Sequence, residues 1–165
     1  MRIIAGERKG MRLEAPAGQA VRPTSDKLRG AVMSQLGGFF DGERVLDVCA
    51  GTGAVALEFL SRGAGSAVAI EQDRTALAAL RRNAEHTRLS DRLEVLSCDA
   101  VAGLARLKGR QFDFVYVDPP YDAELYSAIL QALLTHDVLA ESAQVLVESR
   151  DGLSDLTAWH VLLER

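Results

Sequence analysis

Short apolar runs alternate with stretches of helical periodicity from residue 44 onward. The runs are four to six residues long and rich in Val, Leu, Ile and Phe, which is typical of strands buried on both faces. This alternation predicts a mostly parallel sheet covered by helices on both faces, which is an open, doubly wound α/β fold. Predicted strands cover 45–49, 67–71, 93–97, 112–117 and 145–148, with a candidate sixth at 159–163, and predicted helices cover 54–62, 74–86, 101–107 and 123–134.

The pattern before residue 44 is different. Residues 2–15 predict two short strands, with Gly6 and Gly10 near the turn of a hairpin. A stretch containing proline and glycine follows, and a helix is predicted from a cap at Thr24 to about Phe39. We therefore expect a single-domain protein with two parts, an amino-terminal arm (residues 1–24) and an α/β domain (residues 25–165).

Composition excludes several classes of protein. Hydrophobic residues make up 48% of the 165 residues and charged residues 25%, with only 4 Pro, so the chain can bury a core and is neither a disordered tail nor a coiled coil. No apolar run reaches the roughly 18 residues of a membrane span, and the charged start is unlike a signal peptide. We expect a cytoplasmic protein. Cys49 and Cys98 lack zinc-site spacing and are interpreted as reduced core residues, and we expect no metal.

Charge is unevenly distributed along the chain. The net charge is −4, yet residues 1–30 contain seven basic and three acidic side chains, a net +4 against −8 for residues 31–165. A basic arm on an acidic body fits a phosphate backbone, although an arginine-rich solvated surface would have the same composition. Charge alone leaves both interpretations open. The seven basic residues are Arg2, Arg8, Lys9, Arg12, Arg22, Lys27 and Arg29.

A glycine loop follows the first predicted strand. Residues 51–56 fit the pattern G-x-G-x-x-A, which nicotinamide, flavin and S-adenosylmethionine enzymes share. Asp47, inside the preceding strand, would repel a pyrophosphate but suits a ligand with an ammonium and a sulfonium group. In open α/β sheets ligands bind outside the carboxyl ends of the strands, at the switch point of the strand order. We therefore expect a cofactor crevice at the ends of the first, second and fourth strands.

Two further acidic residues end predicted strands. Glu71 lies 18 residues after Gly53, where a carboxylate can accept hydrogen bonds from both hydroxyls of a ribose. The plainer interpretation of Glu71 is an exposed charge at a strand end. Asp99 could accept a hydrogen bond from an adenine amine, and it could equally cap the helix that follows.

The tetrapeptide Asp118-Pro119-Pro120-Tyr121 follows the fourth predicted strand. Two prolines hold the chain extended and rigid, so a carboxylate and a backbone carbonyl can accept the two hydrogens of a base amine and aim its lone pair at a methyl group. Tyr121 offers a ring on which a base can stack. The alternative is a Pro-Pro turn that caps the next helix. No catalytic histidine is needed, and His86, His136 and His160 are interpreted as surface residues.

Several motifs together resemble a known family. The runs 45–47, 50–54 and 60–64, with Arg22-Pro23-Thr24 upstream and the tetrapeptide downstream, are similar to the RsmD-type 16S rRNA guanine-N2 methyltransferases of bacteria. The opening residues 2–6 match the amino-terminal hairpin of that family. The resemblance covers nearly the whole chain. It implies a class I methyltransferase (Rossmann-like) fold, S-adenosylmethionine as methyl donor, and a guanine 2-amino group in small-subunit rRNA as acceptor.

The resemblance also implies roles for particular residues. The candidate catalytic residues are Asp118, Pro119, Pro120 and Tyr121. The candidate cofactor-binding residues are Asp47, Ala50, Gly51, Thr52, Gly53, Glu71, Gln72, Asp99 and Ala100. The candidate RNA contacts are Arg2, Arg8, Lys9, Arg12, Arg22, Thr24 and Arg29.

The sequence departs from the family pattern at two places. Gly30 stands where the family usually has Glu, so a substrate role is not carried over to that position. The family ends with an antiparallel strand pair, and residues up to Arg165 leave room for the first strand alone, so we expect a short sheet edge.

Other functions share parts of this pattern. A DNA or RNA adenine-N6 methyltransferase would carry the same tetrapeptide, but a DNA enzyme normally inserts a recognition region, and only residues 99–111 separate the third and fourth strands. A protein-glutamine methyltransferase usually has Asn in place of Asp118 and needs no basic arm. An RNA-binding module on the same fold would not need to hold an amine. We expect a monomer that acts on rRNA or on an assembling small ribosomal subunit.

Overall fold

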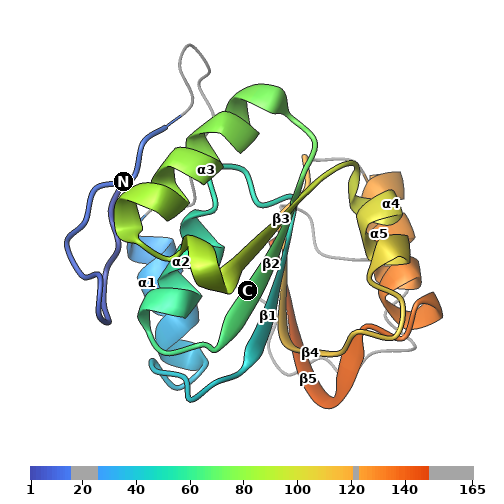
Figure 1. Cartoon of the computed structure of the whole chain (residues 1–165). Helices are drawn as coiled ribbons and strands as arrows, with labels where there is room; N and C mark the ends of the chain where they lie inside the picture. Colours follow the sequence, from blue (N-terminus) through green and yellow to red (C-terminus); the bar gives the residue numbers. More distant parts are fainter. Residues whose placement is uncertain (16–25, 121–122, 149–165) are drawn as a thin grey trace.

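The computed structural model describes residues 1–15, 26–120 and 123–148. Its regular elements follow the predicted alternation of strand and helix (Figure 1). The elements are α1 (Asp26–Gln35), β1 (Arg44–Val48), α2 (Ala54–Ser61), β2 (Ser66–Glu71), α3 (Arg74–Thr87), the 3-10 turn η1 (Ser90–Arg92), β3 (Leu93–Ser97), α4 (Ala100–Arg106), β4 (Phe112–Val117), α5 (Ala123–Thr135) and β5 (Leu139–Val147).

The five strands form one parallel sheet in the order β3-β2-β1-β4-β5. Strands β2 and β3 therefore extend the sheet on one side of β1, and β4 and β5 extend it on the other side. The ends of β1, β2 and β4 are in register, since Val48 pairs with Ile70 on one side and with Val117 on the other. The switch point lies between β1 and β4, where such sheets bind ligands. The predicted α/β fold class is confirmed.

Helices cover both faces of the sheet, which makes three layers (Figure 1). On one face the side chains of α2 and α3, together with Ile3 and Leu13 of the arm and Met33 of α1, form one apolar core. On the other face α4 and α5 pack on a second core that includes Leu104 and Ile129. Both faces of the strands are thus removed from water, which explains their nearly continuous apolar sequences.

Two predicted boundaries differ from the structure by several residues. Helix α1 ends at Gln35 rather than near Phe39, because Gly37 and Gly38 take left-handed φ values of 96° and 83°. Strand β5 starts at Leu139 rather than at residue 145, with an irregular register between its pairs with Phe112 and Phe114. The candidate strand at 159–163 lies outside the described residues.

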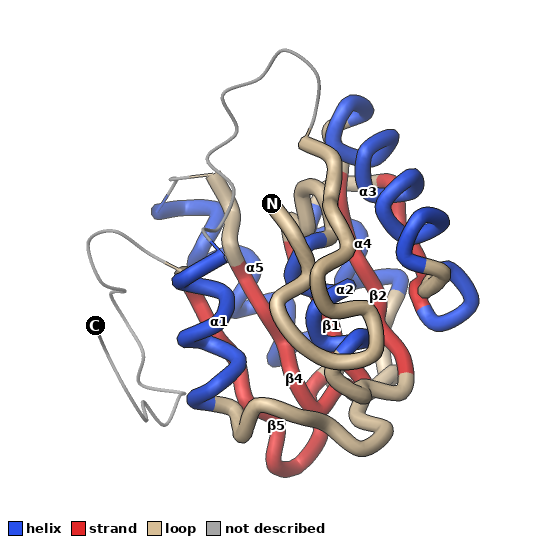
Figure 2. Tube along the Cα trace, turned by 90° about the vertical axis from the view of Figure 1, so that its left-hand side faces the viewer, coloured by secondary structure: helices blue, strands red, loops and turns tan. Residues whose placement is uncertain are grey.

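The predicted hairpin is present in a short form. Arg2 and Arg12 form an antiparallel bridge, and Ile3 N–H donates to Met11 O at 2.9 Å. Its turn lies against the end of α2, as the tube in Figure 2 shows. A Cβ atom on Gly6 would lie 1.8 Å from the carbonyl oxygen of Ser61, so this close approach requires glycine.

The two cysteines are free thiols at half-buried positions, packed against the second core rather than inside it. Of the histidines, His86 is exposed and His136 is half-buried, and His160 lies outside the described residues. Within the ranges that the structure describes, no helix combines the length and the apolar character that crossing a bilayer needs.

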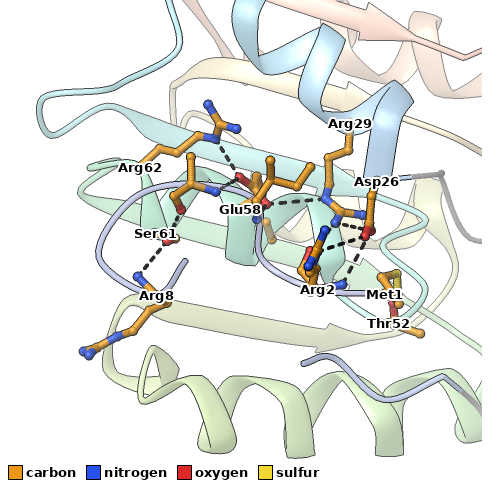
Figure 3. A network of polar contacts seen from close by, with 12 residues as sticks. Met1, Arg2, Arg8, Asp26, Arg29, Thr52, Glu58, Ser61 and Arg62 are labelled. Atoms are coloured by element: carbon orange, nitrogen blue, oxygen red, sulfur yellow. Dashed lines mark hydrogen bonds and ion pairs between the residues drawn. The ribbon is translucent and has the colours of Figure 1, made fainter. Parts of the chain in front are cut away.

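Glu58 of α2 is a buried carboxylate that joins the arm, α1 and α2 (Figure 3). Its side chain is completely buried. It accepts hydrogen bonds from the backbone N–H groups of Ile4 (2.8 Å) and Ala5 (3.0 Å) and from Nε of Arg62 (2.7 Å). Nε of Arg29 on α1 lies 3.5 Å from the other side of the same carboxylate. One negative charge thus stabilises two buried guanidinium groups and two backbone amides.

Arg29 corrects one of the expected RNA contacts. The residue is only 1% exposed, and its guanidinium group also donates to Asp26 (3.0 Å) and to the backbone carbonyl of Arg2. The reason is that Arg29 lies on the face of α1 that packs on α2, where its charge is compensated by Glu58. Arg29 is therefore a structural residue that fixes the arm and α1, and it does not reach an RNA surface.

We predict that Glu58→Ala lowers the free energy of unfolding by about 3–5 kcal/mol, because the buried charges of Arg29 and Arg62 would lose their partner. Glu94→Ala is the control: Glu94 pairs with Arg110 at the surface, with both side chains about half exposed, and its loss should cost less than about 1 kcal/mol. Urea denaturation measures both. Equal, small losses in the two variants would contradict the role given to Glu58.

Candidate functional site

The loop between β1 and α2, residues 50–53 (the glycine loop), makes a sharp turn at the carboxyl edge of the sheet. Cys49, Gly51 and Gly53 all take left-handed φ values, of 64°, 56° and 74°. A Cβ atom on Gly53 would lie 2.9 Å from Cγ of Leu80, so Gly53 lets α3 pack closely under the loop. At Gly51 no atom lies within 4 Å of the place a Cβ would take. The outer side of the loop is therefore open to a ligand.

Asp47 lies under this loop in the middle of the sheet. It is 2% exposed, and its Oδ2 accepts a hydrogen bond from the backbone N–H of Ala56, in the first turn of α2, at 3.0 Å. Burial raises the pKa of Asp47 to about 7; the Ala56 hydrogen bond lowers it in part, and the charges of Asp118 and Glu71 raise it further. Three carboxyl groups thus influence one another at the ends of β1, β2 and β4.

The same carboxylates act on Cys49. Burial first, and then the charges of Glu71, Asp47 and Asp118, raise the pKa of the Cys49 thiol to about 12. The thiol therefore stays protonated near neutral pH, which excludes Cys49 as a thiolate nucleophile. The crevice is acidic, and it favours a ligand that brings positive charge.

Glu71 joins the two loops that border the crevice. Its Oε2 accepts from Gly51 N–H at 2.7 Å, and its Oε1 accepts from Gln72 and Asp73 N–H at 2.8 Å each. Glu71 is thus half-buried and holds three backbone amides, which an exposed strand-end charge would not do. The expected hydrogen bonds to two ribose hydroxyls stay a prediction, and a ligand hydroxyl would have to share these oxygens or replace one of the amides.

Asp99 and its neighbours lie at the end of β3. Asp99 caps α4, because its side chain accepts a hydrogen bond from Ala102 N–H at 2.9 Å. The interpretation of Asp99 as a helix cap is therefore confirmed. The side chain of Asp99 is exposed, as is that of Gln72, whereas Ala100 is buried. Cys98 N–H donates to Glu71 O at 3.2 Å, which holds this end of β3 beside the end of β2. A contact between Asp99 and an adenine amine stays a prediction.

Asp118 and the prolines continue β4 into the same crevice. Asp118 is half-buried, Pro119 is buried and Pro120 is exposed. Asp118 N–H donates to Val48 O at 3.4 Å, so the tetrapeptide begins beside the end of β1. Tyr121, the fourth expected catalytic residue, lies outside the described residues.

Sequence reasoning missed a group of side chains that supports this segment. Glu148, just after β5, donates its N–H to Val117 O at 2.9 Å. Tyr116 donates its hydroxyl to the Glu148 carboxylate, and Tyr126 of α5 donates to the Glu148 carbonyl at 2.6 Å. The only sequence signal was two tyrosines on faces that were expected to be apolar, since a buried Tyr hydroxyl requires a partner.

The expected RNA contacts are only partly brought together. Lys9 and Arg12 are exposed on the hairpin, the side chain of Arg2 is 69% exposed, and that of Arg8 is 30% exposed. Arg22 and Thr24 lie outside the described residues.

Thr52 differs from the other residues of the glycine loop. It is 7% exposed, and its hydroxyl lies 4.0 Å from the sulfur of Met1, so its side chain contacts the arm. In the described part of the chain, no three His, Cys, Asp or Glu side chains are grouped so that they could hold a metal ion.

Comparisons with known proteins find relatives over nearly the whole chain. The family model described as Conserved hypothetical protein 95 matches residues 1–164. Ribosomal RNA small subunit methyltransferase D of Escherichia coli (strain K12) is 34% identical over 168 residues, which cover 100% of this chain and 84% of that protein. The enzyme of the same name from Haemophilus influenzae is 28% identical over 169 residues, 100% of this chain and 88% of that protein.

A solved structure of the Escherichia coli protein yhhF superposes with a TM-score of 0.84 at 34% identity, covering 96% of this chain and 86% of that one. The two chains therefore share one fold. Because the family model spans nearly the whole chain and relatives agree with it in both sequence and fold, the protein belongs to the RsmD family of methyltransferases.

Proposed function

We propose that the protein transfers a methyl group from S-adenosylmethionine to the exocyclic 2-amino group of a guanine in small-subunit rRNA. The observation that carries the proposal is the arrangement at the switch point, where the open side of the glycine loop, the buried Asp47, on which the charges of Glu71 and Asp118 act, and the two prolines after Asp118 meet. The family relationship supports the same conclusion, since relatives over the full chain are named as rRNA methyltransferases.

The donor side of the crevice fits S-adenosylmethionine. This donor carries an ammonium and a sulfonium group, and the carboxyl groups of Asp47, Glu71 and Asp118 give the crevice the complementary charge. The open side of Gly51 allows the loop backbone to approach the ligand closely. When bound, S-adenosylmethionine supplies an electrophilic methyl group. The protein residues hold it, and no acid or metal has to activate it.

The acceptor side has to overcome the low nucleophilicity of a base amine, whose lone pair is delocalised into the ring. Asp118 accepts one amine hydrogen, and a backbone carbonyl of the proline segment accepts the other. These two hydrogen bonds would orient the nitrogen so that its lone pair points at the methyl carbon. The new N–C bond would form as the bond from that carbon to the donor sulfur breaks, and the excess amine proton would pass to the Asp118 carboxylate or to water. Tyr121 would stack on the extruded base, which is worth about 1–3 kcal/mol per base.

The arm supplies the contact with RNA. Arg2, Lys9 and Arg12 are exposed on a hairpin that is basic, while the remainder of the chain is acidic. Electrostatic attraction to phosphates would direct the RNA to the arm and away from the acidic body. We propose that the substrate is rRNA or an assembling small subunit, that the protein acts in the cytoplasm where these form, and that it does so as a monomer.

A comparison of acceptors tests this proposal directly. The protein and labelled S-adenosylmethionine are incubated with one acceptor at a time: unmethylated small subunits, naked 16S rRNA, DNA or another protein. We expect label in the rRNA or the subunits, and N2-methylguanine after digestion to nucleosides. Label only in DNA or protein would overturn the proposal, and N6-methyladenine would overturn the guanine assignment.

Asp118→Ala is expected to lower the rate of methyl transfer by about 100-fold or more, because one of the two groups that orient the amine is lost. Affinity for S-adenosylhomocysteine, measured by calorimetry, should change less than about threefold. Asp113→Ala is the matched control: Asp113 lies on β4, the strand that precedes Asp118, but forms a surface ion pair with Arg44 at 3.0 Å. If Asp118→Ala lost rate and cofactor affinity equally, Asp118 would be a structural residue.

Donor binding should depend on pH through Asp47. Because the pKa of Asp47 is raised to about 7, the group is largely protonated below pH 7 and must lose its proton before it can pair with a cation. We expect affinity for S-adenosylmethionine to fall about tenfold for each pH unit below this pKa and to level off above it. Asp47→Asn should bind more weakly at pH 8 and lack this slope. Calorimetry from pH 5.5 to 8.5 measures it, and an unchanged slope in Asp47→Asn would refute the assignment.

A further inference from the structure

Asn83 is an amide side chain on the buried, otherwise largely apolar face of α3. It is 1% exposed, and the buried face around it includes Ala79, Leu80 and Ala84. Its Oδ1 accepts from Glu14 N–H at 2.7 Å, and its Nδ2 donates to Glu14 O at 3.1 Å. The same Nδ2 also donates to Thr52 O at 3.0 Å. All three hydrogen bonds go to backbone groups outside α3.

The two partners of Asn83 belong to different proposed binding segments: Glu14 to the arm, which is proposed to bind RNA, and Thr52 to the glycine loop, which is proposed to bind the methyl donor. Glu14 is in the last described part of the arm, before residues 16–25, and Thr52 is in the middle of the glycine loop. The two segments meet again at the other end of the arm, where the sulfur of Met1 contacts the Thr52 hydroxyl (Figure 3). Leu13 N–H donates to Met1 O at 3.0 Å, so both contacts belong to one paired unit of the arm.

Hydrogen bonds hold the glycine loop at both of its ends. Ala50 N–H donates to Ile70 O at 2.9 Å, Gly51 N–H donates to Glu71, and Gly53 O accepts from Leu57 N–H at 2.9 Å. Between these ends the Thr52 carbonyl accepts from Asn83. Glycine at positions 51 and 53 contributes no side chain that could fix the loop, so a ligand that orders the loop would act on Asn83 through the Thr52 carbonyl. A ligand that orders the arm would act on the same side chain through Glu14.

We propose that Asn83 is a positioning residue that couples binding of the methyl donor at the glycine loop to binding of RNA at the arm. The inference rests on the proposed function and concerns how its two substrates act on one another. Because coupling of binding free energies is reciprocal, the donor product should tighten RNA binding by the same factor by which RNA tightens binding of the donor product. Typical couplings lie between about 5-fold and 150-fold.

The test is the dissociation constant of unmethylated 16S rRNA for the full chain, with and without saturating S-adenosylhomocysteine. We expect S-adenosylhomocysteine to lower this constant at least about fivefold in the unchanged protein. In Asn83→Leu, which replaces the amide by an apolar side chain of similar size, the ratio of the two constants should fall to within about twofold of one. A ratio near one in the unchanged protein, or an unchanged ratio in Asn83→Leu, overturns the proposal.

Thr87→Val is the matched control. Thr87 is also completely buried on α3, one turn beyond Asn83, but its hydroxyl donates within the helix, to Asn83 O at 2.7 Å and to Ala84 O at 3.2 Å. This variant loses a buried polar group of the same helix without touching the arm or the loop. In Thr87→Val, the ratio of the RNA dissociation constants without and with S-adenosylhomocysteine should equal that of the unchanged protein. Equal loss of the ratio in Thr87→Val and Asn83→Leu would mean that α3 stability, rather than Asn83, carries the effect.

Hydrogen exchange of the unchanged protein provides a second test that no folding defect can affect. S-adenosylhomocysteine alone should slow exchange of the Glu14 amide severalfold, because that amide donates to Asn83. Unchanged exchange at Glu14 in protein saturated with S-adenosylhomocysteine overturns the proposal. The measurement needs no RNA, so a protein that binds S-adenosylhomocysteine but not 16S rRNA would refute the proposed function while still testing the link between loop and arm.

Discussion

The buried carboxylate of Glu58 is the interaction on which the arrangement of the amino-terminal half depends. It compensates Arg29 and Arg62 and accepts two backbone N–H groups of the arm. A buried charge is tolerated only where such partners are in place, so this cluster allows one relative position of the arm, α1 and α2. The hairpin is therefore held against the domain at Ile4 and Ala5, although it has hardly any regular sheet structure of its own.

The second constraint is the strand order. Because β4 returns beside β1, the loops after β1, β2 and β4 open on the same edge of the sheet, and three acidic residues far apart in sequence come together there. Burial of Asp47 and the nearby charges of Asp118 and Glu71 make its ionised form unfavourable. A cationic donor relieves part of that cost, which gives the crevice a physical reason to prefer a sulfonium over a pyrophosphate.

The arm and the crevice are not independent parts of the molecule. The arm contacts the glycine loop through Met1 and, by way of Asn83, through Glu14. An enzyme that must bring a methyl donor and a large RNA together benefits from such contacts, because each substrate then helps to order the site of the other.

The sequence by itself determined the parallel α/β fold, the places of the first four strands to within a residue or two, the glycine loop and the candidate residues at the strand ends. These follow from local periodicity and from residues that must adopt special backbone conformations. Only the tertiary structure decided the roles of Arg29, Asn83 and Glu148, and the three amides that Glu71 holds. Apart from Asp26, which lies three residues before Arg29, the partners of the first three lie 22 to 69 residues away in the sequence. A long polar side chain looks the same in the sequence whether it reaches water, RNA or a buried partner, and only packing selects among them.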